Sequence, residues 1–366
     1  MRQITIPGLI GVASLHKALK PLTYFVAIVS LWFLVPSVGA FTSAEADVAF
    51  QSHSNAFYMT KDGRAWFRET TDGGKVSFWM RAEQMEMVLD AYERTTNALY
   101  LSMFTNLYQG FVADHGVTWE HNEFNDDIMW MVIACARGNL LSGSPAFRDT
   151  AKTNFDLCYA RAFSSDLKGG LWWKTNNLSK NACVNGPAAI AAALLSRACG
   201  DPAYLAKAKE LFLWERATLF DSVTGRVSDS INHKGRINPK SWTYNQGTFI
   251  GAANLLGYTN EARLAATFVM NQLCHDGLLP AYGENGDAGG FNGICVRWLA
   301  RYMNERGEQG TFDAWLQKNA DAAWKARRGS DGLSWCRWPE PTPDGPRHSW
   351  GCSSSVVIMQ VVRPTK

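Results

Sequence analysis

The residues in this chain best suited to chemistry are two adjacent aspartates, Asp126 and Asp127, which precede an apolar segment ending in Trp130. Paired carboxyl groups beside aromatic rings suit glycoside chemistry. One protonates the leaving oxygen, while the other attacks or stabilises an oxocarbenium-like centre. The alternative is structural, because acidic residues at a helix start cap the helix and suit its dipole. The segments that position the pair must decide between these interpretations.

Composition indicates a globular protein with an aromatic excess. The 366 residues are enough for one large domain or two ordinary ones, and the apolar content of 46% allows a substantial core. Aromatic residues make up 12% of the chain and include 15 Trp. Tryptophan in this number suits core packing and also suits surfaces that stack on sugar rings.

Residues 1–40 have the pattern of a targeting segment. Three basic residues, Arg2, Lys17 and Lys20, precede an apolar run over 22–38, and small residues follow at 38–40. This pattern predicts a cleaved signal peptide and a secreted or periplasmic protein, with an uncleaved anchor as the alternative. No later segment is apolar enough to span a bilayer, so we expect no membrane contact after signal removal.

Charge and cysteine spacing narrow the classes of partner. Removal of residues 1–40 leaves 33 basic and 33 acidic side chains, which favours a neutral substrate and gives no reason to expect a nucleic acid. The eight cysteines form no CxxC pair, so we predict no metal site and no cofactor. Export would permit disulfides, and Cys336 with Cys352 is the favoured pair. We expect a monomer.

Hydrophobic periodicity after residue 40 predicts a helical chain. Apolar residues recur at three- and four-residue spacing, whereas strand-type alternation is scarce. The expected helices lie near 44–59, 78–95, 98–113, 126–141, 145–162, 182–199, 202–217, 246–256, 259–274, 291–305, 311–326 and 350–362.

The connections between these helices alternate between short and long. Short turns at 96–97, 142–144, 200–201, 257–258 and 307 separate long loops near 60–77, 114–125, 163–181, 218–245, 275–290 and 327–349. Antiparallel pairs joined by short turns place all the long loops at one end. Six such pairs in a closed ring form an all-α (α/α)6 barrel, so we predict one such catalytic domain over 41–366. An open solenoid has the same spacing.

The predicted long-loop end is rich in the side chains that bind sugars. Its loops carry tryptophans together with amides and carboxylates that pair with hydroxyls. We expect about half of these tryptophans to pack rather than bind, as buried tryptophans commonly do. Asp126 and Asp127 end one of the same loops, which favours the catalytic interpretation of the pair.

Five segments of the chain resemble glycoside hydrolase family 76, the α-1,6-mannanases. They occur in the order typical of that family and span nearly all of the chain after residue 40: 125–130, 169–173, 180–186, 242–252 and 291–297. The resemblance implies an (α/α)6 barrel and retaining endo-hydrolysis of α-1,6-linked mannan, with the polysaccharide or its oligosaccharides as substrate. It also implies that Asp126 is the nucleophile and Asp127 the general acid/base.

Hydrolysis that retains the anomeric configuration needs the two carboxyl groups close together. Neighbouring side chains on a regular helix, however, diverge. We therefore expect the pair at the junction between loop and helix. The candidate substrate-binding residues lie on the predicted loop face, some of them with capping as the alternative role: Trp119, Trp172, Trp173, Asn181, Asp229, Tyr244, Asn245 and Gln246. Arg297 is expected to pair with an acidic residue.

Two other functions keep the same barrel. A transglycosylase would use the same two carboxyl groups and pass the sugar to another glycan, as some fungal wall proteins similar to the family are thought to do. A non-catalytic glycan-binding barrel would not need two ionisable groups side by side. The sequence leaves endo or exo action and the branching of the mannan open.

Overall fold

The structure is a computed structural model that describes residues 41–364, so the predicted signal peptide over 1–40 lies outside the described residues. Within this range the chain forms twelve α-helices: α1 (Ser43–Phe57), α2 (Phe78–Thr95), α3 (Ala98–His115), α4 (Asn125–Ser142), α5 (Pro145–Ala162), α6 (Ala182–Cys199), α7 (Pro202–Thr218), α8 (Thr243–Leu256), α9 (Thr259–Phe268), α10 (Phe291–Arg306), α11 (Gln309–Lys325) and α12 (Ser349–Val361).

Strands are confined to the long loops. β1 (Tyr58–Lys61) and β2 (Arg64–Phe67) form a hairpin before α2, while a second antiparallel sheet joins β3 (Ser179–Asn181), β4 (Ser230–Asn232) and β5 (Ile237–Asn238). The all-α prediction is therefore confirmed. The largest boundary differences are α8, which begins three residues early, and α9, which passes into a π-turn at Val269–Leu273.

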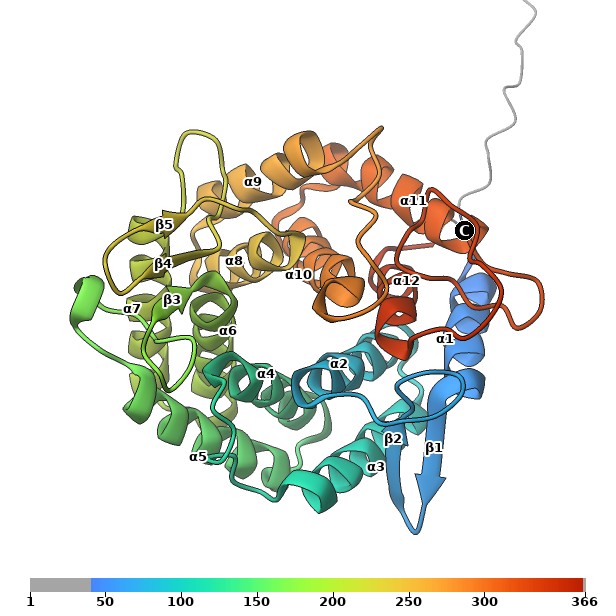
Figure 1. Cartoon of the computed structure of the whole chain (residues 1–366), viewed down its shortest axis with the longest axis horizontal. Coiled ribbons are helices and arrows are strands. Elements are labelled where there is room, and N and C mark those ends of the chain that lie inside the picture. Colours follow the sequence, from blue (N-terminus) through green and yellow to red (C-terminus); the bar gives the residue numbers. More distant parts are fainter. Residues whose placement is uncertain (1–40, 365–366) are drawn as a thin grey trace, which may run out of the picture. The chain divides into compact units, whose positions relative to one another are not determined.

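The even-numbered helices form a closed inner ring. Each of α2, α4, α6, α8, α10 and α12 contacts the next, and α12 returns to α2 (Figure 1). Each inner helix also contacts an outer helix next to it in sequence, and α12 additionally contacts α1 from the other end of the described chain. The ring excludes the open solenoid, and the predicted (α/α)6 barrel is confirmed.

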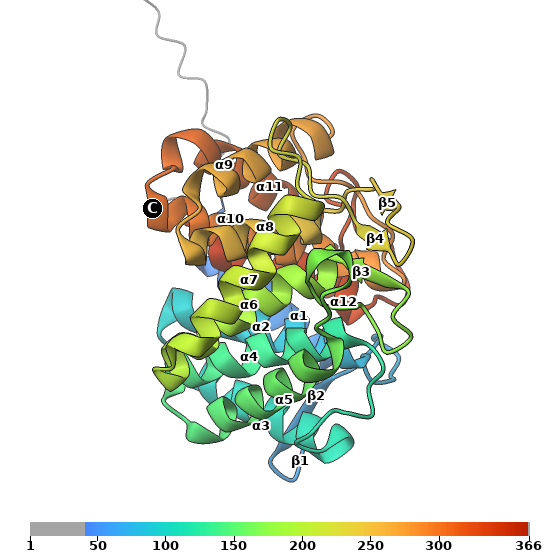
Figure 2. The ribbon, with the colours of Figure 1, turned by 90° about the vertical axis from the view of Figure 1, so that its left-hand side faces the viewer.

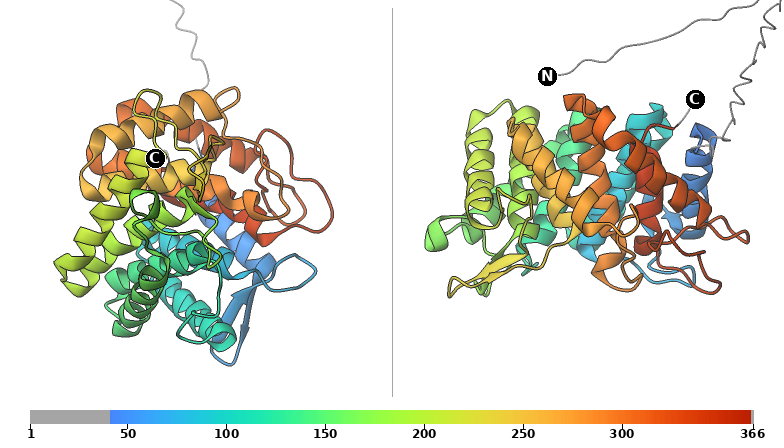
Figure 3. Two further views of the ribbon diagram at one scale, coloured as in Figure 1. Left: turned by 60° about the vertical axis from the view of Figure 1, so that its left-hand side comes forward. Right: turned by 90° about the horizontal axis from the view of Figure 1, so that it is seen from above.

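The alternation of short and long connections has a local cause. Gly143 and Gly200 end α4 and α6 in the left-handed conformation, with φ of 74° and 66°, and Pro145 and Pro202 begin the next helices. Glycine adopts this conformation without a Cβ clash, and proline fits the first helical position. The strands and long loops gather at the opposite end of the ring (Figures 2 and 3).

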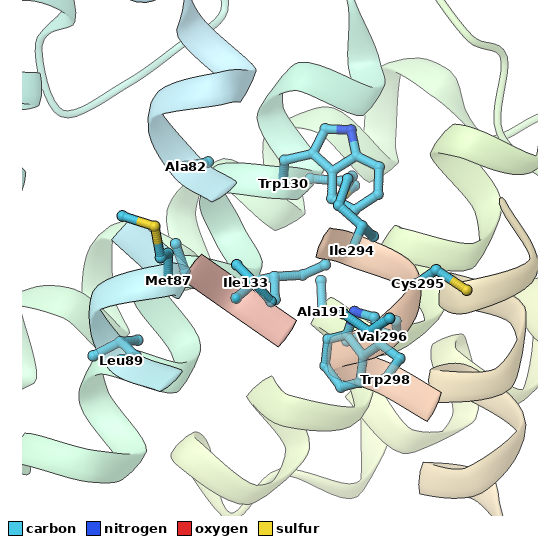
Figure 4. Close-up of a cluster of buried hydrophobic side chains, with 14 of the residues drawn as sticks. Ala82, Met87, Leu89, Trp130, Ile133, Ala191, Ile294, Cys295, Val296 and Trp298 are labelled. Carbon is cyan, nitrogen blue, oxygen red and sulfur yellow. The ribbon is translucent and has the colours of Figure 1, made fainter. Parts of the chain in front are cut away.

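The core fills the space between and inside the inner helices. Figure 4 shows Trp130, Ile133, Val296 and Trp298 among the side chains of this cluster, all of them buried. Close helix contact requires small residues here, because a Cβ on Gly247 of α8 would lie 2.5 Å from Cys295 Cα of α10. The expectation that no segment after residue 40 is apolar enough to span a bilayer is wrong for α6, which passes by length and composition, although 78% of it is buried in the barrel.

Below the loop end, a buried charge cluster crosses the barrel. Arg137 of α4 and Arg297 of α10 both pair with Asp90 of α2, at 2.8 and 2.7 Å, and with Glu86, at 3.1 Å each. Arg297 also pairs with Glu83, so the expected acidic partner of Arg297 is confirmed. Burial raises the pKa of Glu83 to about 7, against the lowering effect of Arg297.

All eight cysteines of the chain are free. The expected Cys336–Cys352 disulfide is therefore wrong. The Cys336 thiol instead donates a hydrogen bond to the backbone oxygen of Tyr282, at 3.3 Å, and the Cys352 side chain is buried in the first turns of α12.

The buried charge cluster makes a sharp stability test. We expect Arg297→Met to lower the free energy of unfolding by about 3–5 kcal/mol, because it leaves Glu86 and Asp90 with one arginine each and Glu83 with none. The Arg301 side chain is 24% exposed and pairs with Glu93, so Arg301→Met should cost about 1 kcal/mol or less. Urea unfolding of both variants measures this difference, and equal losses would contradict the dependence on the cluster.

Candidate active site

A pocket of about 500 Å³ opens at the loop end of the barrel. It is lined by six aromatic residues, four aspartates, an asparagine and a cysteine: Trp79, Phe124, Asp126, Asp127, Trp130, Trp173, Asn181, Cys183, Asp229, Tyr244, Asp287 and Phe291. Both predicted catalytic aspartates therefore face one aromatic pocket.

The first turns of the inner helices supply most of this lining. Trp79 is the second residue of α2, Cys183 the second of α6, Tyr244 the second of α8 and Phe291 the first of α10. The Tyr244 ring stacks on Phe291 at 3.9 Å between centroids with 18° between planes. Because every inner helix begins at the long-loop end, closure of the ring brings these side chains together.

Asn125 fixes the start of α4. Its backbone N–H donates to Trp173 O at 2.9 Å, its side-chain amide donates to Trp172 O at 2.8 Å, and its Oδ1 accepts from Arg161 Nε at 2.7 Å. The N-cap position is Phe124, so neither aspartate caps the helix. We expected the first aspartate to lie at the junction between loop and helix, outside helical geometry. Instead, α4 begins at Asn125, so Asp126 and Asp127 both lie inside its first turn.

Asp127 is the better solvated of the two carboxyl groups. Asn122 Nδ2 donates a hydrogen bond to its Oδ2 at 3.0 Å. Burial raises the pKa of Asp127 to about 6, the Asn122 hydrogen bond opposes this rise, and the charge of Asp287 across the pocket adds to it. Burial thus outweighs the hydrogen bond, because it disfavours the ionised form.

Asp126 is the more deeply buried carboxyl group, and its donor is a thiol. The Cys183 thiol donates to its Oδ2 at 3.4 Å, while its Oδ1 is buried without a hydrogen-bond partner, as is the Trp173 indole Nε1. Burial and then the Asp127 charge raise the pKa of Asp126 to about 8, although the nearby Trp173 and Cys183 side chains act to lower it.

The two carboxyl groups titrate as a coupled pair. At neutral pH a pKa of about 8 for Asp126 and about 6 for Asp127 leave one proton and one negative charge between them. A site with one neutral acid and one carboxylate can protonate a leaving group and attack a sugar carbon.

Comparison with known proteins identifies the family. The model of glycosyl hydrolase family 76 matches residues 42–363. The chain belongs to glycosyl hydrolase family 76. The resemblance of the five sequence segments is therefore confirmed, and with it the prediction of an enzyme.

Solved structures of this family have the same fold as this enzyme. The α-1,6-mannanase of a Salegentibacter species is 32% identical, with a TM-score of 0.79 over 87% of this chain and 98% of that one. An inactive variant of that mannanase, with two consecutive aspartates replaced by asparagine, was solved in complex with α-1,6-mannotriose. It gives a TM-score of 0.80 at 31% identity over 87% of this chain and 98% of that one.

Curated relatives come from yeasts. A mannan endo-1,6-α-mannosidase of Saccharomyces cerevisiae is 23% identical in an alignment of 350 positions, which covers 81% of this chain and 74% of that protein. A mannan endo-1,6-α-mannosidase of Candida albicans is 26% identical over 66% of this chain and 61% of that protein. The match to the second relative therefore spans less than two thirds of its length.

Four of the predicted substrate-binding residues of this family 76 enzyme line the pocket: Trp173, Asn181, Asp229 and Tyr244. Asn181 occupies the N-cap position of α6 but makes no capping hydrogen bond with its side chain. The Asp229 carboxylate accepts hydrogen bonds from Ser230, Asn238 and, at 3.5 Å, Asn245. Asn245 thus stands behind Asp229, with its own Oδ1 buried and unpartnered.

Besides Asn245, three predicted residues lie outside the pocket. Trp119 is buried against Phe78 and Phe111, so no face of its ring is open to a sugar. Trp172 is 5% exposed and lies under the Lys180 ammonium, 4.7 Å from the ring centroid. Gln246 is buried, and its side chain binds backbone atoms of Gly225, Val227 and Ala265. For these three, packing replaces the expected substrate contact.

Several pocket residues were not among the predicted site residues: Trp79, Phe124, Trp130, Cys183, Asp287 and Phe291. Four of them lie in or beside the first turn of an inner helix. These four residues directly follow a long loop. The predicted helix boundaries alone could therefore have identified them as candidates for the pocket.

Matched tryptophan variants test this placement. We expect Trp119→Phe to lower the free energy of unfolding by about 1–3 kcal/mol with kcat/KM on glycan unchanged, because the indole fills the core and donates to Gly116 O. Trp173→Phe should leave the melting temperature nearly unchanged and raise KM about three- to tenfold through lost stacking. Thermal melts and steady-state kinetics of both proteins measure the effects. The reverse pattern would contradict the assignment.

Proposed function

We propose that this chain is an exported, retaining endo-α-1,6-mannanase that cleaves α-1,6-linked mannan through a glycosyl-enzyme intermediate. The observation that carries the proposal is that the two adjacent aspartates Asp126 and Asp127 line one aromatic pocket at the loop end of the barrel, where burial raises the pKa of both carboxyl groups. The sequence contains no second pair of consecutive aspartates.

The relatives support both the substrate and the catalytic pair. The Salegentibacter mannanase was made inactive by replacing two consecutive aspartates, and its inactive variants were solved with α-1,6-mannotriose and α-1,6-mannotetrose. The yeast relatives are mannan endo-1,6-α-mannosidases. A neutral glycan also agrees with the balanced charge of residues 41–366.

The proposed reaction has two steps. Asp126 attacks the anomeric carbon while Asp127 gives its proton to the glycosidic oxygen, which leaves as a free hydroxyl. Asp127, now a carboxylate, then takes a proton from water, and the resulting hydroxide equivalent displaces Asp126 from the sugar. The mannose unit regains its original configuration, and the pair regains one proton and one charge.

The pKa order of the pair is the reverse of these roles. The nucleophile must be ionised, yet the pKa of Asp126 is raised to about 8 and that of Asp127 to about 6. The two values describe a coupled pair, and the single proton is shared between its members. We propose that a bound sugar completes the reaction-ready arrangement by placing its glycosidic oxygen beside Asp127 and its developing positive charge beside Asp126.

The rest of the pocket suits a mannose chain. Tyr244 and Trp173 offer aromatic faces to sugar rings, while Asp229 and Asn181 offer acceptors and donors to hydroxyl groups. We also propose that the protein acts as a monomer. We further propose that residues 1–40 direct export and are then removed.

The direct experiment is product analysis on unbranched α-1,6-mannan. The full-length gene is expressed, the exported protein is recovered, and its N-terminus is read by mass spectrometry, with Phe41 expected. Wild-type protein should release short mannose oligomers, whereas Asp126→Ala and Asp127→Ala should lose about 10²–10⁴-fold or more in kcat. Mass spectrometry and chain-length analysis of the products measure this.

The control for these variants is Asp149→Ala, an exposed carboxylate on the outer helix α5, which should keep full activity. A mannoside with a good leaving group separates the roles, because only the variant that lacks the general acid should keep substantial activity on it. Longer transfer products would instead indicate a transglycosylase. Saturable mannan binding without products would leave a glycan-binding barrel.

The shared proton predicts a bell-shaped pH profile. We expect kcat/KM to fall below about pH 6, where Asp127 also becomes protonated and no carboxylate remains, and above about pH 8, where Asp126 also ionises and no acid remains. Initial rates measured across the range from about pH 4 to about pH 10 cover both limbs. A rate that stays constant between about pH 4 and about pH 7 would contradict the shared proton.

A further inference from the structure

Cys183 occupies an unusual place for a free thiol. It is the second residue of α6, it is 4% exposed, and it lines the pocket beside the catalytic pair. Its Sγ lies 3.4 Å from Asp126 Oδ2. In the described part of the chain, it is the one side chain whose hydrogen bond to the Asp126 carboxylate has a suitable distance and angle.

The thiol acts as a donor because it stays protonated. Burial raises the pKa of the Cys183 thiol well above its ordinary value, and the neighbouring Asp126 and Asp229 charges raise it further. A protonated thiol has one hydrogen to give, and it is a weaker donor than a hydroxyl or an amide. Asp126 therefore receives orientation from Cys183 with little stabilisation of its charge, whereas Asp127 receives a full amide hydrogen bond from Asn122.

A tyrosine continues the chain of protic groups. The Tyr244 hydroxyl acts to lower the pKa of the Cys183 thiol, and burial with the Cys183 charge raises the pKa of Tyr244 well above its ordinary value. Tyr244, Cys183 and Asp126 come from the first turns of α8, α6 and α4, which are neighbours in the inner ring. The thiol thus comes from the helix that lies between the other two in the ring.

We propose that Cys183 is a positioning residue, whose thiol holds the Asp126 carboxylate in its reacting orientation and, as a weak donor, leaves the negative charge of Asp126 lightly stabilised. The inference rests on the proposed function in taking Asp126 as a catalytic carboxylate. A stronger donor at position 183 would bind the charge of Asp126 too tightly for the pair to share its proton near neutral pH.

Other titratable groups face the same region and must be kept constant in a test. They come from α4, from α5, from the loop before β4, from α8 and from the loop before α10: Asp127, Cys158, Asp229, Tyr244 and Asp287. None of them changes in a Cys183 variant, so a shifted pH limb reports the donor at position 183.

The kinetic test compares two variants with opposite expectations. In Cys183→Ser a hydroxyl replaces the thiol, so one limb of the kcat/KM profile should move to lower pH by about 0.5–1 unit. In Cys183→Ala the donor is lost, so the same limb should move to higher pH. The limb that moves belongs to Asp126. Profiles that superimpose on the wild type for both variants, with melting temperatures unchanged, would overturn the proposal.

A spectroscopic arm needs no substrate. The S–H stretching band of Cys183, assigned by its loss in Cys183→Ala, should shift when the pH crosses the ionisation of Asp126, and it should stay constant with pH in Asp126→Asn. If the S–H band of the wild-type protein does not shift with pH, the proposal is overturned even when the enzyme is active. If the S–H band shifts with pH but the protein cleaves no α-1,6-mannan, the proposed function is refuted, while the contact between Cys183 and Asp126 is supported.

Cys199→Ser is the matched control. Cys199 ends the same helix at the short-turn end, and its thiol is partly exposed. This variant should match the wild type in pH profile and in the Cys183 band. A shift in Cys199→Ser equal to that in Cys183→Ser would show a general effect of thiol replacement on α6 and would overturn the specific role of Cys183.

Discussion

The constraint on which the rest depends is closure of six inner helices that all begin at the long-loop end. Because they run in the same direction, their first turns meet around one axis, and side chains as distant in sequence as Trp79 and Phe291 line one pocket. Antiparallel inner helices would split the same residues between two ends. The pocket is thus a consequence of alternating short and long connections, and the loops need only hold the helix starts in place.

The same geometry sets two electrical effects against each other at Asp126. Helix N-termini favour a carboxylate, by about 2 kcal/mol at most, whereas burial and the adjacent charge disfavour it. One pKa unit corresponds to about 1.4 kcal/mol, so a rise from 3.8 to about 8 means that burial and repulsion prevail. Weak donation by Cys183 fits this balance. A barrel end rich in strong donors would leave two carboxylates and no acid.

The sequence predicts the parts of this structure that local physics determines. Helix periodicity and the Gly–Pro turns at Gly143 and Gly200 place the twelve helices and both ends of the barrel, and the aspartates follow from their place after a long loop. Ring closure does not follow, since it depends on small angles accumulated over six pairs. The sequence also cannot show that Trp119 lies in the core and Trp173 in the pocket. The position of an indole in a loop depends on residues that are distant in sequence.

The buried charge cluster shows how a rigid frame and a reactive end share the same helices. On α10, Phe291 lines the pocket and Arg297 lies in the cluster six residues later, within one of the segments that carry the family resemblance. The same arrangement occurs on two other inner helices. On α4, Asp127 lines the pocket and Arg137 lies in the cluster, and on α2, Trp79 lines the pocket and Asp90 lies in the cluster. A helix that slides by one residue moves by about 1.5 Å along its axis, which would separate these charges in a medium where unpaired charge costs several kcal/mol. The cluster therefore fixes the height at which each first turn presents its side chain, and so the relative position of the catalytic pair and the aromatic rings.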